Sequence, residues 1–487
     1  MSSIYTEAFN VISWHTPSAS RICQNEFRLD ASFFANSAEH ARAALVSSGM
    51  PTKRLSELAS VFALSDFSLA RIPAAEDRGV PFFTFSDILE WDAQPTTFLS
   101  TKYELNLDDY KVQEGWVLLS RAGTIGNAII VGPELVGKAV ANHAIRIVPK
   151  GRDTGSLLYL ILTGSIGRTV ISSLMYGSVV DVIKPAQLQD LAIPVPPASV
   201  LHRISEAIAG SLAARSESLR MLRASCELVH KANSLLPLPR QTTFSEQGQL
   251  QPSTFRISAQ DVSGNATHGC EYRLDGHFYN PTAQLAVANI KKCLRGVKTV
   301  GDVAERVLMG PRFKRNYVEA THGVPFLSGK NIGQIRPTDL KYLSNLQMAD
   351  MQELLVNREW TLITCSGTIG RTCFVWKNYE DYAASQHILR VIPDKSNIDP
   401  GYLYAFLSSR YGYEQILRYR HGSVIDEITD TQIKQVLVPC PSRKEQTAIG
   451  DKVREAYEKR AEAIRLEDEA QAILMKELTK APGTKGA

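Results

Sequence analysis

The chain has 487 residues, of which 44% are hydrophobic and 21% are charged. At roughly 100–200 residues per domain this length excludes a single compact domain, and the supply of apolar side chains excludes a disordered chain. Lys and Arg (54) outnumber Asp and Glu (50) by only 4, which excludes a polycation, so an anionic partner has to bind at local basic patches.

Cysteine usage and hydropathy indicate the compartment. The seven cysteines are odd in number and include no Cys-x-x-Cys pair, so neither a disulfide framework nor a structural zinc site is expected. Residues 1–9 lack the basic and apolar parts of a signal peptide. The most apolar stretch, 157–162, is far shorter than the roughly 20 residues that span a bilayer. We therefore expect a soluble protein of the reducing cytoplasm, with no membrane partner.

The chain contains one internal repeat, at an offset of 244 or 245 residues. Matching segments occur in the same order in both halves: Arg28-Leu29-Asp30 with Arg273-Leu274-Asp275, Gly123-Thr124-Ile125-Gly126 with Gly367-Thr368-Ile369-Gly370, His143 with His387, Arg146 with Arg390, Gly177-Ser178-Val179 and Asp181 with Gly422-Ser423-Val424 and Asp426, and Ile193-Pro194 with Val438-Pro439. Because the period is half the chain, we interpret the repeat as a tandem duplication of a whole module.

Each copy begins with a mixed pattern of strands and helices. Short β-branched and aromatic runs, such as 116–119 and 128–131, alternate with Gly, Pro and Asp turns and predict strands. More helical segments follow at 156–174 and 401–418. The Gly-Ser element and a strand that ends in a Pro-x-Pro segment complete each copy. The fold class predicted is therefore α/β (α+β), with two tandem mixed domains.

A long amphipathic helix is predicted after each Pro-x-Pro segment. Apolar residues recur at spacings of three, four and seven over 204–229 and again over 449–478. Ser442 and Glu445 predict a capping box at the start of the second helix, whereas Val200 replaces the glutamate in the first. Each helix would have about 35 residues and a length of roughly 50 Å.

The apolar stripe of each helix has to be buried, and two arrangements would do so. Each helix packs on its own globular domain, or the two helices pair as an antiparallel coiled coil that holds the domains apart as a pseudo-two-fold dumbbell; we favour the second. The predicted boundaries are a first domain at 1–197, a helix at 198–236, a linker at 237–269, a second domain at 270–441, a helix at 442–480 and a disordered tail at 481–487.

No motif for catalysis or cofactor binding stands out in the sequence. Residues 323–330 resemble a phosphate-binding loop, but five residues separate its glycines where four are required. His143 and His387 have no recurring nucleophile or carboxylate beside them. The two Gly-Thr-Ile-Gly segments would bind phosphate through backbone N–H groups or simply form tight turns, and the pattern leaves both interpretations open.

One loop differs almost completely between the copies. Residues 310–317 read Gly-Pro-Arg-Phe-Lys-Arg-Asn-Tyr, whereas residues 65–72 at the same register read Ser-Asp-Phe-Ser-Leu-Ala-Arg-Ile. Between Arg295 and Arg420 there are 17 Lys and Arg against 12 Asp and Glu. Cations interleaved with aromatic and amide side chains suit phosphate neutralisation and hydrogen bonding to base edges, although a merely solvated basic loop has the same composition.

Taken together, these residues resemble the specificity (S) subunit of type I restriction-modification systems. The resemblance covers nearly the whole chain and rests on the duplicated order of Gly-Thr-Ile-Gly turn, Gly-Ser element, proline segment and long helix. Pro441, Glu445, Gln446 and Ile449 match the family pattern closely, while the first copy departs from it at Val200 and Leu201. The resemblance implies a non-catalytic subunit that binds a bipartite, asymmetric DNA target, one domain per half-site.

The resemblance also implies the partners. Two methyltransferase subunits that use S-adenosylmethionine would bind the chain, with Glu445, Gln446 and Ile449 as contacts, and restriction subunits that use ATP and Mg²⁺ would join where present. This chain itself would hold no metal or cofactor. The side chains expected at double-stranded DNA are Arg312, Lys314, Arg315 and Tyr317, then Lys330, Arg336 and Arg371, and in the first copy Arg71 and Arg121.

Two other functions stay open on the sequence alone. One is a stand-alone DNA methyltransferase or nuclease with an unrecognised site. The other is a duplicated DNA-binding adaptor in a different phage-defence complex.

Overall fold

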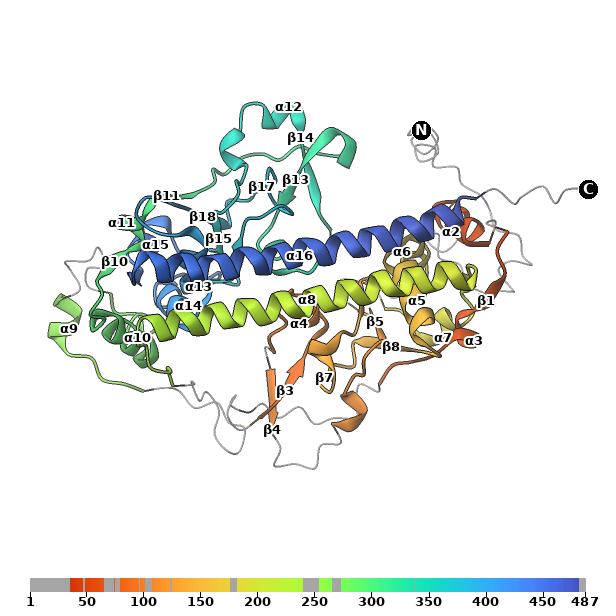
Figure 1. The fold of residues 1–487 in the computed structure, drawn as a ribbon, viewed down its shortest axis with the longest axis horizontal. Helices are drawn as coiled ribbons and strands as arrows, with labels where there is room; N and C mark the ends of the chain where they lie inside the picture. Colours follow the sequence, from red (N-terminus) through yellow and green to blue (C-terminus); the bar gives the residue numbers. More distant parts are fainter. Residues whose placement is uncertain are drawn as a thin grey trace, which may run out of the picture.

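The computed structural model describes residues 36–46, 49–64, 74, 79–95, 97–100, 107–122, 125–175, 182–239, 254–264, 273–337 and 339–480. The predicted tail and most of the predicted linker lie outside these ranges. Two globular units flank a pair of long helices (Figure 1). We refer to residues 36–197 as lobe 1 and to residues 273–441 as lobe 2.

The strands of the two lobes follow one another in a similar order along the chain. Those of lobe 1 are β1 (Thr52–Arg54), β2 (Ala59–Phe62), β3 (Gly79–Phe83), β4 (Thr97–Ser100), β5 (Val117–Ser120), β6 (Ala128–Ile130), β7 (Ala139–Val140), β8 (Ala144–Pro149) and β9 (Ala192–Pro194). Those of lobe 2 are β10 (Val297–Thr299), β11 (Ala304–Met309), β12 (Tyr317–Val318), β13 (Gly323–Leu327), β14 (Lys341–Ser344), β15 (Thr361–Thr364), β16 (Thr372–Phe374), β17 (Ala383–Ala384), β18 (Ile388–Pro393) and β19 (Leu437–Pro439).

Each lobe contains three sheets, one of which is a two-stranded antiparallel pair, β1-β9 in lobe 1 and β10-β19 in lobe 2. The larger, antiparallel sheet has the order β2-β8-β5-β6 in lobe 1 and β11-β18-β15-β16 in lobe 2. The smaller sheet has the order β4-β3-β7 in lobe 1 and β12-β14-β13-β17 in lobe 2, with one parallel pair in each, β3 with β7 and β13 with β17. This common order confirms two tandem mixed α/β domains.

Short helices surround the sheets. In lobe 1 they are α2 (Asn36–Val46), α3 (Leu55–Leu58), α4 (Phe85–Ile88), α5 (Arg152–Thr163), α6 (Ser165–Ser173) and α7 (Pro185–Gln189). After lobe 1 come α9 (Ala259–Gly264), α10 (Pro281–Lys291), α11 (Val300–Val303), α12 (Asn345–Met348), α13 (Pro400–Ser408), α14 (Arg410–Leu417) and α15 (Asp430–Lys434). Within the described part of the chain, no helix taken singly has the length and apolarity to cross a membrane, and only the bent pair α5 and α6 meets that test jointly.

The repeated arginine of each larger sheet is a structural residue. Arg146 on β8 and Arg390 on β18 are both 0% exposed. Arg146 donates hydrogen bonds to the carbonyl oxygens of Ala144 and Val140, at 3.0 and 2.7 Å. Burial lowers the pKa of each arginine to about 10, so both side chains remain protonated at neutral pH. A buried cation is tolerated here because backbone carbonyls take the place of its water.

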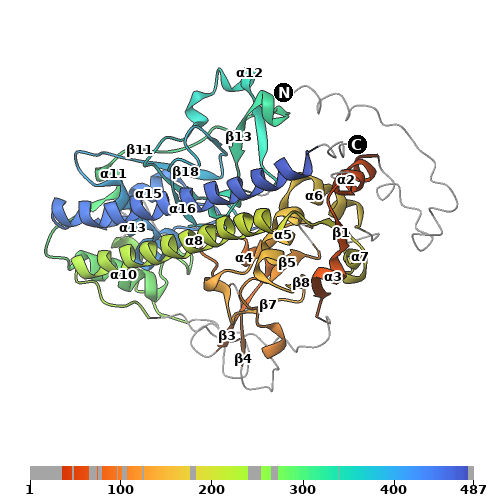
Figure 2. The same cartoon turned by 45° about the vertical axis from the view of Figure 1, so that its right-hand side comes forward.

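The two long helices, α8 (Ala198–Ala232) and α16 (Arg443–Leu478), run side by side in opposite directions (Figures 1 and 2). With 35 and 36 residues, each is about 50 Å long. The predicted capping box is present in α16, where the Ser442 hydroxyl accepts a hydrogen bond from the Glu445 N–H. The antiparallel pairing predicted from the sequence is therefore confirmed.

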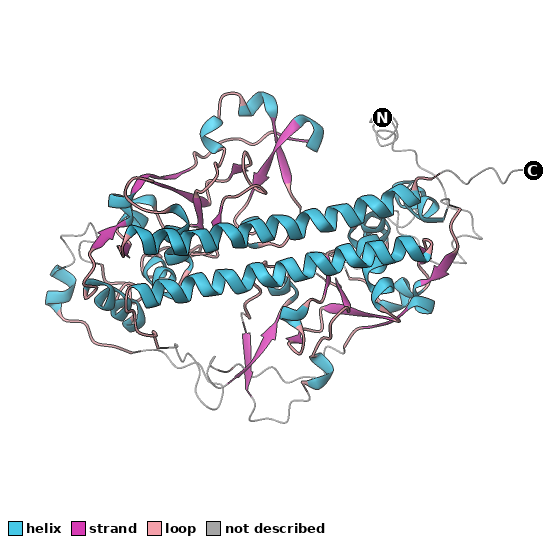
Figure 3. Ribbon diagram, viewed as in Figure 1, coloured by secondary structure: helices cyan, strands magenta, loops and turns pink. Residues whose placement is uncertain are grey.

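Each long helix also belongs to the core of both lobes. Ile204 and Ile208, near the start of α8, pack in the core of lobe 1, whereas Val229 near its end packs in the core of lobe 2. The far end of α16 likewise adds Ala470 and Leu474 to the core of lobe 1. Packing on the helix's own lobe, which we treated as the alternative to pairing, thus occurs together with it. The helices cover the inner faces of both lobes (Figure 3).

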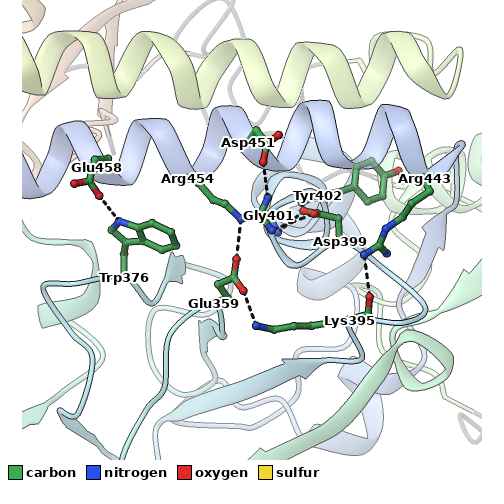
Figure 4. A network of polar contacts seen from close by, with 10 residues as sticks. All are labelled: Glu359, Trp376, Lys395, Asp399, Gly401, Tyr402, Arg443, Asp451, Arg454 and Glu458. Atoms are coloured by element: carbon green, nitrogen blue, oxygen red, sulfur yellow. Dashed lines mark hydrogen bonds and ion pairs between the residues drawn. The ribbon is translucent and has the colours of Figure 1, made fainter.

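A polar network fixes α16 to lobe 2 (Figure 4). The Glu359 carboxylate accepts hydrogen bonds from Lys395 and Arg454, at 2.6 and 2.7 Å, and Arg454 also reaches Asp399 at 3.0 Å. Burial opposes ionisation of Glu359, but the hydrogen bonds from Lys395 and Arg454 outweigh it and lower the pKa of the carboxyl. Asp399 in turn caps α13 by accepting from the Gly401 and Tyr402 N–H groups. The network keeps lobe 2 in a fixed position along the helix.

Candidate nucleic-acid interface

The basic loop, residues 310–317, joins β11 to β12 at the edge of the smaller sheet of lobe 2. Phe313, one of its two aromatic residues, points inward and packs on the core with its ring 6.3 Å from that of Phe326. Gln347 holds the loop backbone by accepting from the Asn316 N–H at 3.0 Å and donating to the Lys314 carbonyl at 2.6 Å. The loop is therefore anchored from behind.

This anchoring leaves the cations of the loop on its outer surface. Arg312 and Lys314 are exposed, and neither forms an ion pair with any residue in the described ranges. Arg315 is half-buried, because its guanidinium donates to the Gln386 side chain at 2.6 Å and lies over the Phe326 ring at 5.4 Å. Two free cations beside one fixed cation form a surface suited to phosphate and base edges.

Tyr317 and a lysine that the sequence analysis missed extend this surface. Tyr317 is 42% exposed, and the Lys341 ammonium lies 4.8 Å from the centre of its ring. The two residues come together because β12 pairs with β14, with Tyr317 opposite Leu343. No local pattern could have identified Lys341, since its place depends on that strand pairing.

The Gly-Thr-Ile-Gly segment of lobe 2 is a tight turn. Gly367 and Gly370 have φ angles of 73° and 87°, which glycine adopts without strain. Their N–H groups donate to the carbonyls of Asp426 and Thr364, both at 3.0 Å. Two of the donors that would cradle a phosphate are thus already occupied, which favours the turn over the phosphate site. In lobe 1, Gly126 also has a positive φ of 85°, while Gly123, Thr124 and the first Gly-Ser element lie outside the described residues.

Hydrogen bonds connect the turn to the Gly-Ser element and, through residues 386–387, to the basic loop. Cys365, just before the turn, donates its N–H to the His387 carbonyl at 3.0 Å, and the neighbouring Gln386 side chain holds Arg315. In the Gly-Ser element, Val424 and Ile425 are 93% and 57% exposed. Exposed apolar side chains of this kind are typical of a binding surface.

Arg336 and Arg371 form ion pairs within this chain. Arg336 pairs with Glu467 and Asp468 of α16, at 2.8 and 2.9 Å. Arg371 pairs at 2.6 Å with Glu90 of lobe 1. Acids of the same chain already neutralise both cations, so a DNA phosphate would have to displace those acids, and the DNA contact of both arginines stays a prediction. The acids come from distant segments, which explains why a local sequence pattern could not reveal the pairing.

The other cations predicted to contact DNA lie in different environments. Lys330 is exposed and pairs with Asp339 at 3.0 Å, so a DNA phosphate would have to displace that carboxylate. Arg121 is half-buried, and its backbone is held between the His143 carbonyl at 2.8 Å and the Ile183 N–H at 3.1 Å. Arg71 lies outside the described residues.

Two of the three predicted partner contacts are buried inside this chain. Gln446 and Ile449 are 4% and 3% exposed. The Gln446 side chain bonds to the Asp399 N–H at 3.1 Å and the Pro441 carbonyl at 2.9 Å, which ties the start of α16 to lobe 2. Both side chains thus serve the packing of this chain, and their contact with a partner stays a prediction. Glu445 stays partly exposed, but its carboxylate is engaged by Arg295 and by the helix cap.

Comparison with known proteins gives two matches to one family model. The model for the type I restriction modification DNA specificity domain matches residues 48–209 and again residues 296–466, together more than half of the chain. These two ranges fall on the two halves of the repeat. The first includes most of lobe 1 and the start of α8, and the second includes most of lobe 2 and most of α16. No curated protein matches this chain.

Solved structures of low similarity were also found. One is the crystal structure of a type I restriction-modification system S subunit from M. genitalium, with 12% identity, a TM-score of 0.35, and coverage of 88% of this chain and 95% of that one. Another is the HsdS subunit from Thermoanaerobacter tengcongensis, with 15% identity, a TM-score of 0.27, and coverage of 89% and 97%. A third belongs to a study of complex assembly in a type I restriction-modification system, with 17% identity, a TM-score of 0.27, and coverage of 89% and 98%.

Proposed function

The chain belongs to the type I restriction-modification DNA specificity family, and we propose that its two lobes bind the two half-sites of one split DNA target. The family is one of DNA-recognition subunits, which leave catalysis to partner methyltransferase and restriction subunits. The finer assignment concerns which surface reads DNA and how many partners bind.

The single observation that supports the proposal best is the basic loop of lobe 2. Arg312 and Lys314 project from a backbone that Phe313 and Gln347 hold in place, so DNA would meet cations that are already positioned. Positioned donors lose less conformational entropy on binding than flexible ones. The two copies share no residue at this register, as expected if the two half-sites of an asymmetric target differ.

The arrangement of the lobes suits a split target. Half-sites on one face of B-DNA lie about 34–36 Å apart, one helical turn, and helices of about 50 Å connect the lobes over a comparable distance. The bases between the half-sites would then go unread. We further propose that two methyltransferase subunits bind, one for each half of the pseudo-symmetric chain, and that they carry the S-adenosylmethionine, while restriction subunits would supply the ATP-dependent activity.

The test is a DNA-binding and methylation measurement on the full complex with its methyltransferase partner. If Arg312 reads a guanine edge, Arg312→Ala should cost about 1–3 kcal/mol in binding and relax one position of the target. Lys314→Ala should instead weaken binding to all sequences and reduce the slope of log affinity against log salt by about one.

Arg465→Ala is the matched control, because Arg465 lies on α16 and is paired with Glu469. This variant should keep both the target and the salt dependence. An unchanged methylation site in Arg312→Ala, together with an unchanged salt slope in Lys314→Ala, would remove the basic loop from the DNA surface.

A further inference from the structure

The two lobes touch each other directly at the middle of the helix pair. The backbone N–H of Trp91 in lobe 1 donates to the Gly333 carbonyl of lobe 2 at 2.7 Å, and the backbone N–H of Ile335 donates to the Leu89 carbonyl at 2.9 Å. Glu90 and Gln334 form the centre of this antiparallel bridge. We call the contact between 89–91 and 333–335 the inter-lobe bridge.

The inter-lobe bridge joins equivalent positions of the repeat. Residues 89, 90 and 91 correspond to 333, 334 and 335 at the offset of 244 that relates the Gly-Thr-Ile-Gly turns. The contact is therefore isologous, like the interface of a two-fold symmetric dimer. Because backbone groups of both lobes are hydrogen-bonded here, a rotation of one lobe against the other would distort these bonds.

Two equivalent buried arginines support the bridge from the long helices. Arg215 of α8 and Arg460 of α16, related by an offset of 245, donate to the carbonyls of Glu90 and Gln334, at 3.2 and 2.8 Å. Both guanidinium groups also face the Trp91 ring, at 5.7 and 4.7 Å. The bridge backbone is thus bonded to both helices at once.

An ion pair locks the same contact across the lobes. Arg371, directly after the Gly-Thr-Ile-Gly turn of lobe 2, reaches the Glu90 carboxylate of lobe 1 at 2.6 Å, with side-chain exposures of 35% and 16%. Ile335 packs on the hydrophobic cluster of lobe 1 that contains Ile88. The bridge therefore combines backbone hydrogen bonds, apolar packing and one charge pair.

We propose that the inter-lobe bridge fixes the rotation of the two DNA-reading surfaces and so determines the number of unread base pairs between the half-sites. The inference rests on the proposed function. Adding one base pair moves the second half-site by about 3.4 Å along the duplex and rotates it by roughly 35°. The helix pair sets the distance between the lobes, and the bridge resists their rotation about it. Glu90 and Arg371 are positioning residues, since they would act without touching DNA.

The experiment compares spacer selection in charge-reversed variants of the complete complex. Glu90→Arg and Arg371→Glu each place like charges at the contact, and the double variant restores an opposite pair. DNA substrates carry the mapped half-sites with the native spacer or with one base pair more or fewer. We expect wild type to prefer the native spacer by about tenfold or more, each single variant to prefer it by less than about threefold, and the double variant to regain most of the preference.

The control is Lys377→Glu, which breaks an ion pair with Glu458 between lobe 2 and its own helix; it should keep the spacer preference of wild type. Should either reversal unfold the protein, judged by thermal unfolding, Glu90→Gln and Arg371→Gln remove the same charge pair without repulsion. Wild-type spacer preference in all folded variants would overturn the inference. Failure of the wild-type complex to methylate any bipartite site would instead overturn the proposed function.

Discussion

In each half of the chain an ion pair connects the residue that follows the inter-lobe bridge to the long helix of the same half. The acid and the base exchange places between the two halves. In lobe 1, Asp92 pairs with Arg223 of α8 at 2.8 Å; at the equivalent positions of lobe 2, Arg336 pairs with Asp468 of α16 at 2.9 Å. The buried arginines Arg146 and Arg390, by contrast, are the same in both lobes. A partly exposed ion pair needs only opposite charges, so the two residues can exchange places. A buried arginine has to match the positions of several backbone carbonyl groups, so no other residue replaces it.

The largest loss of stability is expected from replacing one of the two buried arginines, because the two differ in the number of carbonyl groups that they contact. Arg390 donates to four carbonyls, those of Ser385, Ile388, Leu354 and Ala384, whereas Arg146 reaches two. Arg390→Met should therefore cost about 3–5 kcal/mol, since each buried acceptor left unpaired costs about 1–3 kcal/mol. Urea unfolding, with hydrogen exchange of β18 and β8 to separate the lobes, measures the loss.

Arg146→Met is the matched comparison and should cost less. Arg390→Lys keeps the charge but cannot span the same carbonyls, so it should lie between wild type and Arg390→Met. Equal losses in Arg390→Met and Arg146→Met would show that the number of carbonyl contacts does not decide the cost.

A smaller loss of stability is expected from substitutions at the point where a short helix of each lobe crosses a long helix. A Cβ added to Gly401 of α13 would lie 2.6 Å from the carbonyl oxygen of Gly450 in α16, whereas Ser156 and Ser205 occupy the equivalent positions of lobe 1. Gly401→Ala should destabilise the protein by about 1–3 kcal/mol, because the helices would have to separate. Ser156→Ala should change stability by less than about 1 kcal/mol, because the crossing already holds a Cβ. Equal changes in the melting temperature of the two variants, measured by thermal unfolding, would contradict this expectation.

The smallest loss of stability is expected from charge reversal in the ion pairs whose signs differ between the two halves. Asp92→Arg and Arg223→Asp should each cost at most about 1 kcal/mol, and the double variant should recover most of it, because both side chains are substantially exposed. Arg336→Asp should cost more than Asp92→Arg, since it faces both Glu467 and Asp468 and leaves the nearly buried Glu467 without its cation. A double-mutant cycle in lobe 1 that shows no coupling would remove the pair from the contacts that hold the loop.

The candidate site shows where sequence reasoning succeeds and where it stops. The difference between 310–317 and 65–72 marked the basic loop, and its exposed Arg312 and Lys314 needed no tertiary information to be noticed. Lys341 was missed because strand pairing brings it to Tyr317. The ion pairs of Arg336 and Arg371 were not foreseen because their acidic partners lie far away in the chain. A cation's charge is visible in the sequence, but whether it is neutralised is not.

The sequence by itself determined the duplication, the order of elements within each copy, the two long helices and the capping box at Ser442. These features depend on periodicity and on neighbours a few residues apart, which a single chain displays directly. Only the tertiary structure decided that each helix enters the core of both lobes, that Gln446 and Ile449 are buried, and that Glu90 meets Gln334 and Arg371. Such contacts join segments more than a hundred residues apart or depend on which face of a helix is covered, and no local pattern of apolar and charged residues specifies that.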